Sequence, residues 1–341
     1  KVFLIFLTFS TGTVRDYYNN YWLFIKCKYN TFLIFKKLNK IMKTLTPTEA
    51  DWLSKLTWLS WHELYKHLKK LANDDLDNKH LDEYRWALSL WSEYTNDTKH
   101  QVIVTLDWRD TAGKGSNIRR VTDYFDDKRY DVRAYWIPSS HEKKWYNWFN
   151  RYMKDFPEPW KVWFFDRSWY NRAWVEAAMW FCTEDEYNWF LEHVSQFEKD
   201  QIIDMWISYV KVYLSIGKET QVKRLKWRDK EMKRWKSSFI DAKAQEKRNY
   251  YTLAKKKILE LTDTLHAPWI VLDSNKKFSS SVEIIKKIIN SSDEVSKIIK
   301  NELSIDLSPN HKISRTAQQE LIRMDEEWCM LHMKEKFKFA K

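Results

Sequence analysis

The sequence predicts an α/β fold in which a mostly parallel five-stranded sheet is flanked by helices. Three observations lead to this prediction: short apolar runs alternate with helical stretches, a phosphate-loop pattern follows the first run, and carboxylates follow the ends of several runs. Strands that alternate with helices are typical of βαβ units, whose ligands bind at the carboxyl ends of the strands. We therefore expect a phosphate-binding site at that edge of the sheet.

The expected strands are short apolar segments, and helical stretches lie between them. The strands span residues 102–106, 130–135, 162–165, 207–214 and 269–272. The helices lie near residues 117–125, 142–154, 185–203 and 241–261.

The segment QVIVTLDWRDTAGKGS, residues 101–116, combines a buried strand with a loop that resembles a phosphate-binding loop. That pattern is a glycine, four residues and then Gly-Lys-Ser/Thr, placed between a strand and a helix. Gly113 and Lys114 supply its core, but Gly115 stands where a hydroxyl is usual and Ser116 follows one place late. Backbone N–H groups at the helix start and the lysine would attract phosphate oxygens.

Besides this mild departure at Gly115, the loop has one severe departure and one unusual residue. Trp108 stands where the first glycine is expected, and Asp110 lies inside the loop. A carboxylate there would repel phosphate unless a hard cation such as Mg²⁺ lies between them.

Asp166 is the second candidate carboxylate, at the end of a buried-looking strand and directly before Arg167. An aspartate in this place suits metal binding, and arginine offers a planar fork for phosphate oxygens. A helix N-cap is the alternative reading of Asp166.

Residues 217–238, GKETQVKRLKWRDKEMKRWKSS, are dense in lysine and arginine. Such a run is commonly a solvated helix face. Beside a phosphate loop it could instead form a lid, at about residues 217–240, that folds over an anionic substrate.

Composition indicates a globular protein of 341 residues, with 44% apolar and 31% charged residues and no apolar run of about 18 residues that could span a membrane. Three separated cysteines without metal-ligand spacing favour a reduced, cytoplasmic protein. We expect residues 1–41 to be a non-native upstream extension, 42–98 a helical segment, 99–293 the phosphate-loop domain and 294–341 a helical tail.

Glycine is scarce and tryptophan abundant, with 4 Gly and 21 Trp. Average glycine usage of about 7% would predict roughly 24 glycines in such a chain. We hypothesise that many of these tryptophans are glycines in the native protein, as would follow if UGA codons decoded as glycine had been translated as tryptophan.

Four segments of the sequence resemble the polyphosphate kinase 2 family. They are LDWRDTAGKGS, FDRSWYNRAWVEAAMWFCT, RWKSSFID and TDTLHAPWIVLDSNKK, within residues 80–290. The departures have mostly one form, because five tryptophans fall where the family has glycine: Trp108, Trp160, Trp174, Trp180 and Trp206. By contrast, Trp169, Trp235 and Trp269 fall where the family has tryptophan.

The resemblance implies a P-loop kinase fold with a helical lid, and Mg²⁺-dependent phosphoryl transfer between polyphosphate and a nucleotide, from nucleoside diphosphate to triphosphate or the reverse. It also implies a homo-oligomer, as a dimer or tetramer. In the catalytic roles that the family motifs imply, Asp110 and Asp166 position metal and phosphate, Lys114 binds the transferring group, Arg167 neutralises its charge, and Arg224 and Arg228 close over the nucleotide. Weaker candidates for a polyphosphate channel are Arg119, Arg120 and Lys128, for which a solvated face is the alternative.

Two other functions remain open at this stage. An ATP-dependent nucleotide or nucleoside kinase of the P-loop class would use ATP and ignore polyphosphate. A non-catalytic nucleic-acid-binding protein is suggested by the pI of 9.2 and the abundant aromatic residues. We expect neither nucleic acid nor membrane as a partner.

Overall fold

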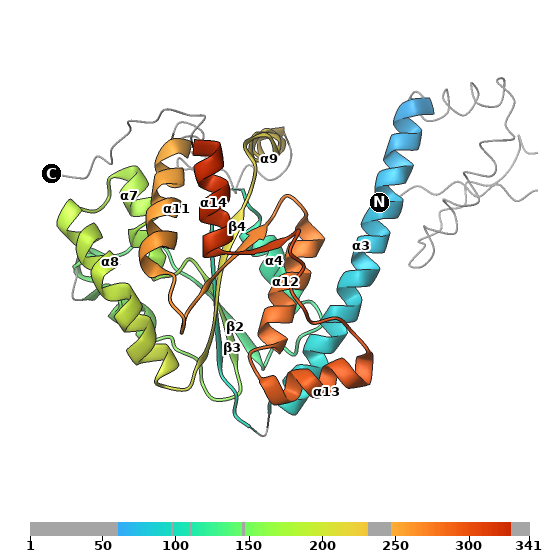
Figure 1. Ribbon diagram of the computed structural model, residues 1–341, viewed down its shortest axis with the longest axis horizontal. Helices are drawn as coiled ribbons and strands as arrows, with labels where there is room; N and C mark the ends of the chain where they lie inside the picture. The colour runs from blue at the N-terminus through green and yellow to red at the C-terminus, as the bar shows by residue number, and fades with distance from the viewer. Residues whose placement is uncertain (1–60, 97, 110, 145–146, 231–246, 329–341) are drawn as a thin grey trace, which may run out of the picture. The chain divides into compact units, whose positions relative to one another are not determined.

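The computed structural model describes residues 61–96, 98–109, 111–144, 147–230 and 247–328 (Figure 1). The predictions for residues 1–41, for Asp110 and for the segment around Trp235 lie outside this part. The chain divides into two compact units, residues 1–80 and 81–341. Of the first unit only the beginning of α3 (Trp61–Tyr94) is described. No helix in the described ranges is long and apolar enough to cross a membrane.

A six-stranded sheet forms the centre of the second unit, in the order β2-β3-β1-β4-β5-β6. All neighbours pair in parallel except β5 and β6, which are antiparallel. The five predicted strands are confirmed, and the sixth was not predicted because it has only three residues. The strands are β1 Val102–Trp108, β2 Tyr130–Ala134, β3 Val162–Asp166, β4 Ser208–Ser215, β5 Trp269–Asp273 and β6 Ser314–Thr316.

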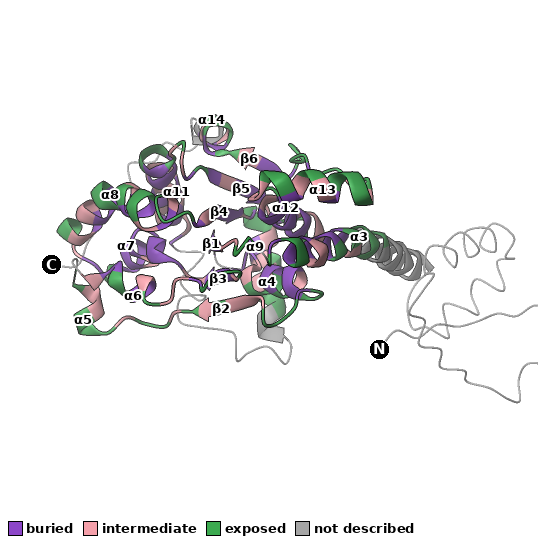
Figure 2. Ribbon diagram, turned by 90° about the horizontal axis from the view of Figure 1, so that it is seen from below, coloured by how far each residue is buried: buried purple, intermediate pink, exposed green. Residues whose placement is uncertain are grey.

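Helices cover both faces of this sheet (Figures 1 and 2). One face packs against the buried residues of α3 from Leu81 onward and against α4 Lys114–Thr122, α12 Lys277–Ile289 and α13 Asp293–Leu303. The other packs against α7 Val175–Met179, α8 Glu184–Glu198, α11 Arg248–Thr262 and α14 Ala317–Trp328. Because both faces are covered, the central strands β1 and β3 are buried on both sides and largely apolar rather than alternating.

Some predicted helices differ in their boundaries. Residues 142–154, expected as one helix, form α5 Ser140–Lys143 and α6 Asn150–Met153, because Ser139 and Glu142 build a capping box that starts α5 early. The stretch 185–203 is α8 followed by a π-helical turn, η4 Lys199–Ile203. The basic segment begins as α9 Lys218–Lys230, and residues 231–246 lie outside the described part.

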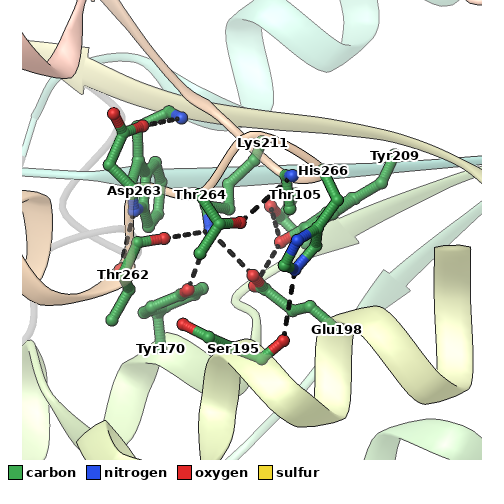
Figure 3. Close-up of polar contacts among 12 residues, drawn as sticks. Thr105, Tyr170, Ser195, Glu198, Tyr209, Lys211, Thr262, Asp263, Thr264 and His266 are labelled. Carbon is green, nitrogen blue, oxygen red and sulfur yellow. Dashed lines mark hydrogen bonds and ion pairs between the residues drawn. The ribbon is translucent and has the colours of Figure 1, made fainter.

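A buried ion pair connects the central strand β4 to α8 (Figure 3). Lys211 Nζ lies 2.7 Å from Glu198 Oε2, and both side chains are fully buried. Lys211 also donates to Tyr170 Oη at 3.0 Å and to the Thr262 carbonyl at 2.8 Å. Burial lowers the pKa of Lys211, and the charge of Glu198 opposes that shift. This network fixes the start of the 3₁₀ turn η3 Trp169–Arg172, which follows β3.

Three of the five tryptophans at suspected glycine positions have left-handed backbone conformations. The φ angles are 65° at Trp160, 62° at Trp180 and 61° at Trp206. A side chain with a Cβ atom pays roughly 1–2 kcal/mol in this region, which glycine occupies freely. Trp180 is also the C-cap of α7, where glycine is the common residue. The backbone therefore supports the glycine hypothesis at these three positions.

The other two positions receive no such support. Trp174 has a φ of −96°, and Trp108 is the last residue of β1. Neither position has the positive φ angle that favours glycine, so the backbone gives no reason for a glycine there.

Replacement of Trp206 separates the Cβ effect from the loss of the ring, because this side chain is 90% exposed. We expect the free energy of unfolding of Trp206→Gly to be about 1 kcal/mol higher than that of Trp206→Ala, since only glycine relieves the left-handed strain. Trp86, 61% exposed within α3, serves as the control. There glycine should be less stable than alanine by about 1 kcal/mol. Urea denaturation measures all four variants, and equal stability of the two Trp206 variants would contradict the assignment.

Candidate active site

The candidate site lies at the carboxyl ends of the parallel strands, as the sequence predicts. Leu106 of β1 is in register with Asp166 of β3, and Trp108 is in register with Leu214 of β4. The loop after β1 and the turn after β3 therefore start side by side at one edge of the sheet.

Gly113 closes the loop and caps α4. Its φ of 93° and ψ of 31° lie in the left-handed region, so a residue with a side chain would be strained here. Asn117 Nδ2 donates to the Gly113 carbonyl at 3.2 Å and holds the first turn. Gly115 and Ser116 are exposed, and a Cβ atom at Gly115 would meet nothing within 4 Å. The first turn of α4 thus presents its N–H groups at an open surface.

Lys114 and Asp166 form an ion pair across this edge. Their side chains are 11% and 26% exposed, so solvent and ligands can reach the carboxylate more readily than the ammonium group. The predicted phosphate-binding lysine and the predicted metal-binding aspartate are therefore adjacent. Asp110, the other predicted metal ligand, lies outside the described part of the chain.

The N-cap alternative for Asp166 does not hold. Ser168 caps η3, because its Oγ accepts a hydrogen bond from the Tyr170 N–H at 3.1 Å. The Asp166 carboxylate instead pairs with Lys114.

Arg167 lies between Asp166 and this cap in an unusual conformation, with a φ of 89°. Its Nη1 reaches the Tyr135 carbonyl at 3.4 Å, a long contact just past the end of β2. A half-buried guanidinium so weakly held can turn toward an anion.

Arg224 of α9 binds backbone carbonyls around the loop. Its Nη1 donates to Thr111 at 3.0 Å and Ala112 at 3.1 Å, and its Nη2 donates to Ser274 at 2.7 Å. The basic helix is thereby attached to the phosphate loop and to the end of β5. The Arg228 side chain lies outside the described part.

The three weaker channel candidates have different surroundings. Arg120 bonds Ser281 and Asn117 between α4 and α12, which is a structural role. Arg119 is exposed and lines a shallow hollow that also holds Asp123, Asp126 and Asp127. Lys128 precedes β2 and therefore lies at the opposite edge of the sheet from the loop.

Asp107 and Ser168 belong to the same region, although no role was predicted for them. Asp107 Oδ2 accepts a hydrogen bond of 2.8 Å from Ser168 Oγ, and both residues are fully buried. Burial raises the pKa of Asp107 to about 7, and the hydrogen bond from Ser168 and the charge of Lys114 oppose that rise. In the sequence, the position of Asp107 near the end of a predicted strand could have identified it as a residue of the site.

The donor set suits a hard divalent cation held partly by substrate. No group of three or more His, Cys, Asp or Glu residues that could hold a metal occurs in the described ranges. Mg²⁺ commonly takes one or two carboxylates together with substrate phosphates and water. The accessible Asp166 carboxylate meets that requirement.

Known proteins with similar sequences and structures share one family. The family model "Polyphosphate kinase 2 (PPK2)" matches residues 70–300. A polyphosphate kinase PPK2B of Corynebacterium glutamicum is 31% identical over 240 residues, which are 70% of this chain and 77% of that protein. A GDP-polyphosphate phosphotransferase of Pseudomonas aeruginosa is 36% identical over 202 residues, 59% of this chain and 56% of that protein.

A solved structure from Pseudomonas aeruginosa, described as a polyphosphate kinase 2, superimposes with a TM-score of 0.60 at 29% identity. The match covers 66% of this chain and 49% of that one, so the chain spans about half the length of this structural relative. The family match covers more than half of the chain and includes every described element of the site. The chain therefore belongs to the polyphosphate kinase 2 family.

Proposed function

We propose that this protein transfers a phosphoryl group between inorganic polyphosphate and a nucleotide. The observation that carries the proposal is the Lys114–Asp166 ion pair at the end of a phosphate loop, inside a chain of this family. Phosphoryl transfer needs alignment and charge neutralisation more than covalent chemistry.

The contacts of the described residues suggest a separate role for each group in the site. The N–H groups of the first turn of α4, with Lys114, would bind the oxygens of the transferring group. Arg167 would turn from the Tyr135 carbonyl to the equatorial oxygens, where charge is spread in the transition state. Arg224 would keep α9 against the loop, and Arg228 is proposed to contribute positive charge to substrate binding.

We further propose that Mg²⁺ is held by Asp166 and Asp110 together with phosphate oxygens. When bound, it would neutralise phosphate charge and align the oxygens. Lys114 would then exchange Asp166 for the phosphate oxygens.

The acceptor is proposed to be a nucleoside diphosphate, so that ADP or GDP becomes ATP or GTP, or the reverse. Related proteins are described as an ADP-polyphosphate phosphotransferase of Rhizobium meliloti and NDP-polyphosphate phosphotransferases of Ruegeria pomeroyi. We also propose a cytoplasmic homo-oligomer, a dimer or tetramer, which sedimentation of the purified protein would test.

Removal of either partner of the ion pair should abolish turnover. We expect Lys114→Ala and Asp166→Asn to lower kcat for polyphosphate-dependent ATP formation by at least about 100-fold, because the first removes a cation that binds the reacting phosphates and the second removes a proposed metal ligand. The exposed Lys297 on α13 gives the control, and Lys297→Ala should keep the parent rate. Circular dichroism checks the fold of each variant. Near-normal turnover in Lys114→Ala would refute the role of the lysine.

Chelation should reveal the metal. Excess EDTA should stop the reaction and added Mg²⁺ should restore it, because phosphate charge must be neutralised next to Asp166. Turnover that continues undiminished in EDTA would exclude a metal requirement.

Restoring glycine at position 108 should raise activity, because the family has glycine there and bulk in the loop should obstruct phosphate. We expect Trp108→Gly to exceed the rate of the printed sequence, measured as ATP formed from ADP and polyphosphate. A lower rate in the variant would show that tryptophan is the working residue.

A screen of phosphoryl donors distinguishes the proposed polyphosphate kinase from an ATP-dependent nucleotide or nucleoside kinase of the P-loop class. Polyphosphate, ATP and GTP are compared as donors with nucleoside mono- and diphosphates as acceptors. Transfer from ATP alone would favour an ordinary nucleotide kinase.

A further inference from the structure

Asp107 is a buried carboxylate that the phosphate chemistry above does not use. Its side chain is fully buried, and Oδ2 accepts one hydrogen bond, from Ser168 at 2.8 Å. Oδ1 is also buried and has no hydrogen-bond partner in the described part of the chain. A buried acceptor without a partner lowers stability, so its presence calls for a reason other than stability.

Ser168 transmits the constraint from Asp107 to the turn after β3. Its Oγ donates to Asp107 and accepts from the Tyr170 N–H at 3.1 Å. Trp169 and Tyr170 are fully buried beyond it, and Tyr170 contacts Lys211 within the network of Figure 3. The chain is therefore fixed directly after Arg167.

Arg167 is the strained residue between two fixed segments. Strand β3 ends at Asp166 on one side, and Ser168 is held by Asp107 on the other. A non-glycine residue keeps a φ of 89° only where its surroundings impose it. The bond between Asp107 and Ser168 is one such constraint on the residue after Arg167, and it ties that residue to the strand that leads into the phosphate loop.

We propose that Asp107 is a positioning residue for phosphoryl transfer, acting through Ser168 to keep the Arg167 backbone in the strained conformation from which its guanidinium can turn from the Tyr135 carbonyl to the phosphates. The inference rests on the proposed function. Asp107 touches no substrate in this account, and its effect reaches the reaction only through Arg167.

Ser168→Ala, Asp107→Ala and Asp107→Asn test the inference, with Thr105→Val as the matched control. Thr105 lies two residues before Asp107 on the same strand and is equally buried. Its Oγ1 bonds the Tyr209 hydroxyl at 3.0 Å, and Tyr209 reaches Tyr170 through Glu198 and Lys211, so Thr105 has no direct bond to the turn after β3 in the described part of the chain.

These substitutions are made in the more active of two parent proteins, the chain with Trp108 and its Trp108→Gly variant. We expect Ser168→Ala and Asp107→Ala to lower kcat by about 10- to 100-fold with KM for polyphosphate changed less than about 3-fold, since misaimed groups slow the step itself.

Asp107→Asn still offers Ser168 a carbonyl oxygen and should retain more activity than Asp107→Ala. Thr105→Val should lower the melting temperature and leave kcat within about 2-fold of the parent. In an Arg167→Ala background, Ser168→Ala should cost no further activity, because its effect passes through Arg167.

Two results would overturn the inference while leaving the proposed function intact. One is a parent-like kcat in Ser168→Ala with a fall in melting temperature like that of Thr105→Val. The other is an undiminished effect of Ser168→Ala in the Arg167→Ala background. Absence of polyphosphate-dependent turnover in both parents would instead overturn the proposed function, and the inference with it.

Discussion

The parallel register between β1 and β3 is the constraint on which the site depends. Because Leu106 pairs with Asp166, β3 ends two residues before the end of β1, and the loop that carries Lys114 begins close to the turn that carries Arg167. The ion pair between Lys114 and Asp166 is possible only in this register, since a slip of one residue would turn the aspartate to the other face of the sheet. The flanking helices, with their two separate apolar cores, hold the strands in that arrangement.

Besides the Lys114–Asp166 ion pair, two arginines near this edge bind uncharged oxygen atoms. Arg224 donates to four carbonyls of the loops after β1 and β5, and Arg109 crosses from the phosphate loop to the Arg248 carbonyl and the Thr252 hydroxyl of α11. These contacts attach α9, with which the basic segment begins, and α11, which follows that segment, to the phosphate loop, and they do not neutralise the charges of the two arginines. An anionic substrate would therefore meet a cationic surface whose geometry is set before it binds.

Much of the fold could be predicted because its signals are local. Apolar runs such as Val102–Leu106 define the parallel strands, whereas β6, with the sequence Ser-Arg-Thr, has no apolar run at all. Lys114 and Asp166 could be predicted to meet because both follow strand ends. The carbonyl partners of Arg224 could not, since every residue offers the same backbone acceptor. The strain at Arg167 was equally hidden, because the turn next to it bonds to a residue far away in the sequence, as the 2.8 Å bond from Ser168 to Asp107, 61 residues earlier, shows.

The central claim is that the edge formed by β1 and β3 moves a phosphoryl group from polyphosphate to a nucleotide. Its most direct test follows the group itself: the protein is incubated with ADP, Mg²⁺ and ¹⁸O-labelled polyphosphate, and the γ-phosphate of the ATP formed is read by ³¹P NMR. The account predicts that the γ-phosphoryl group carries the label at the enrichment of the donor. ATP that forms with an unlabelled γ-phosphate would contradict it.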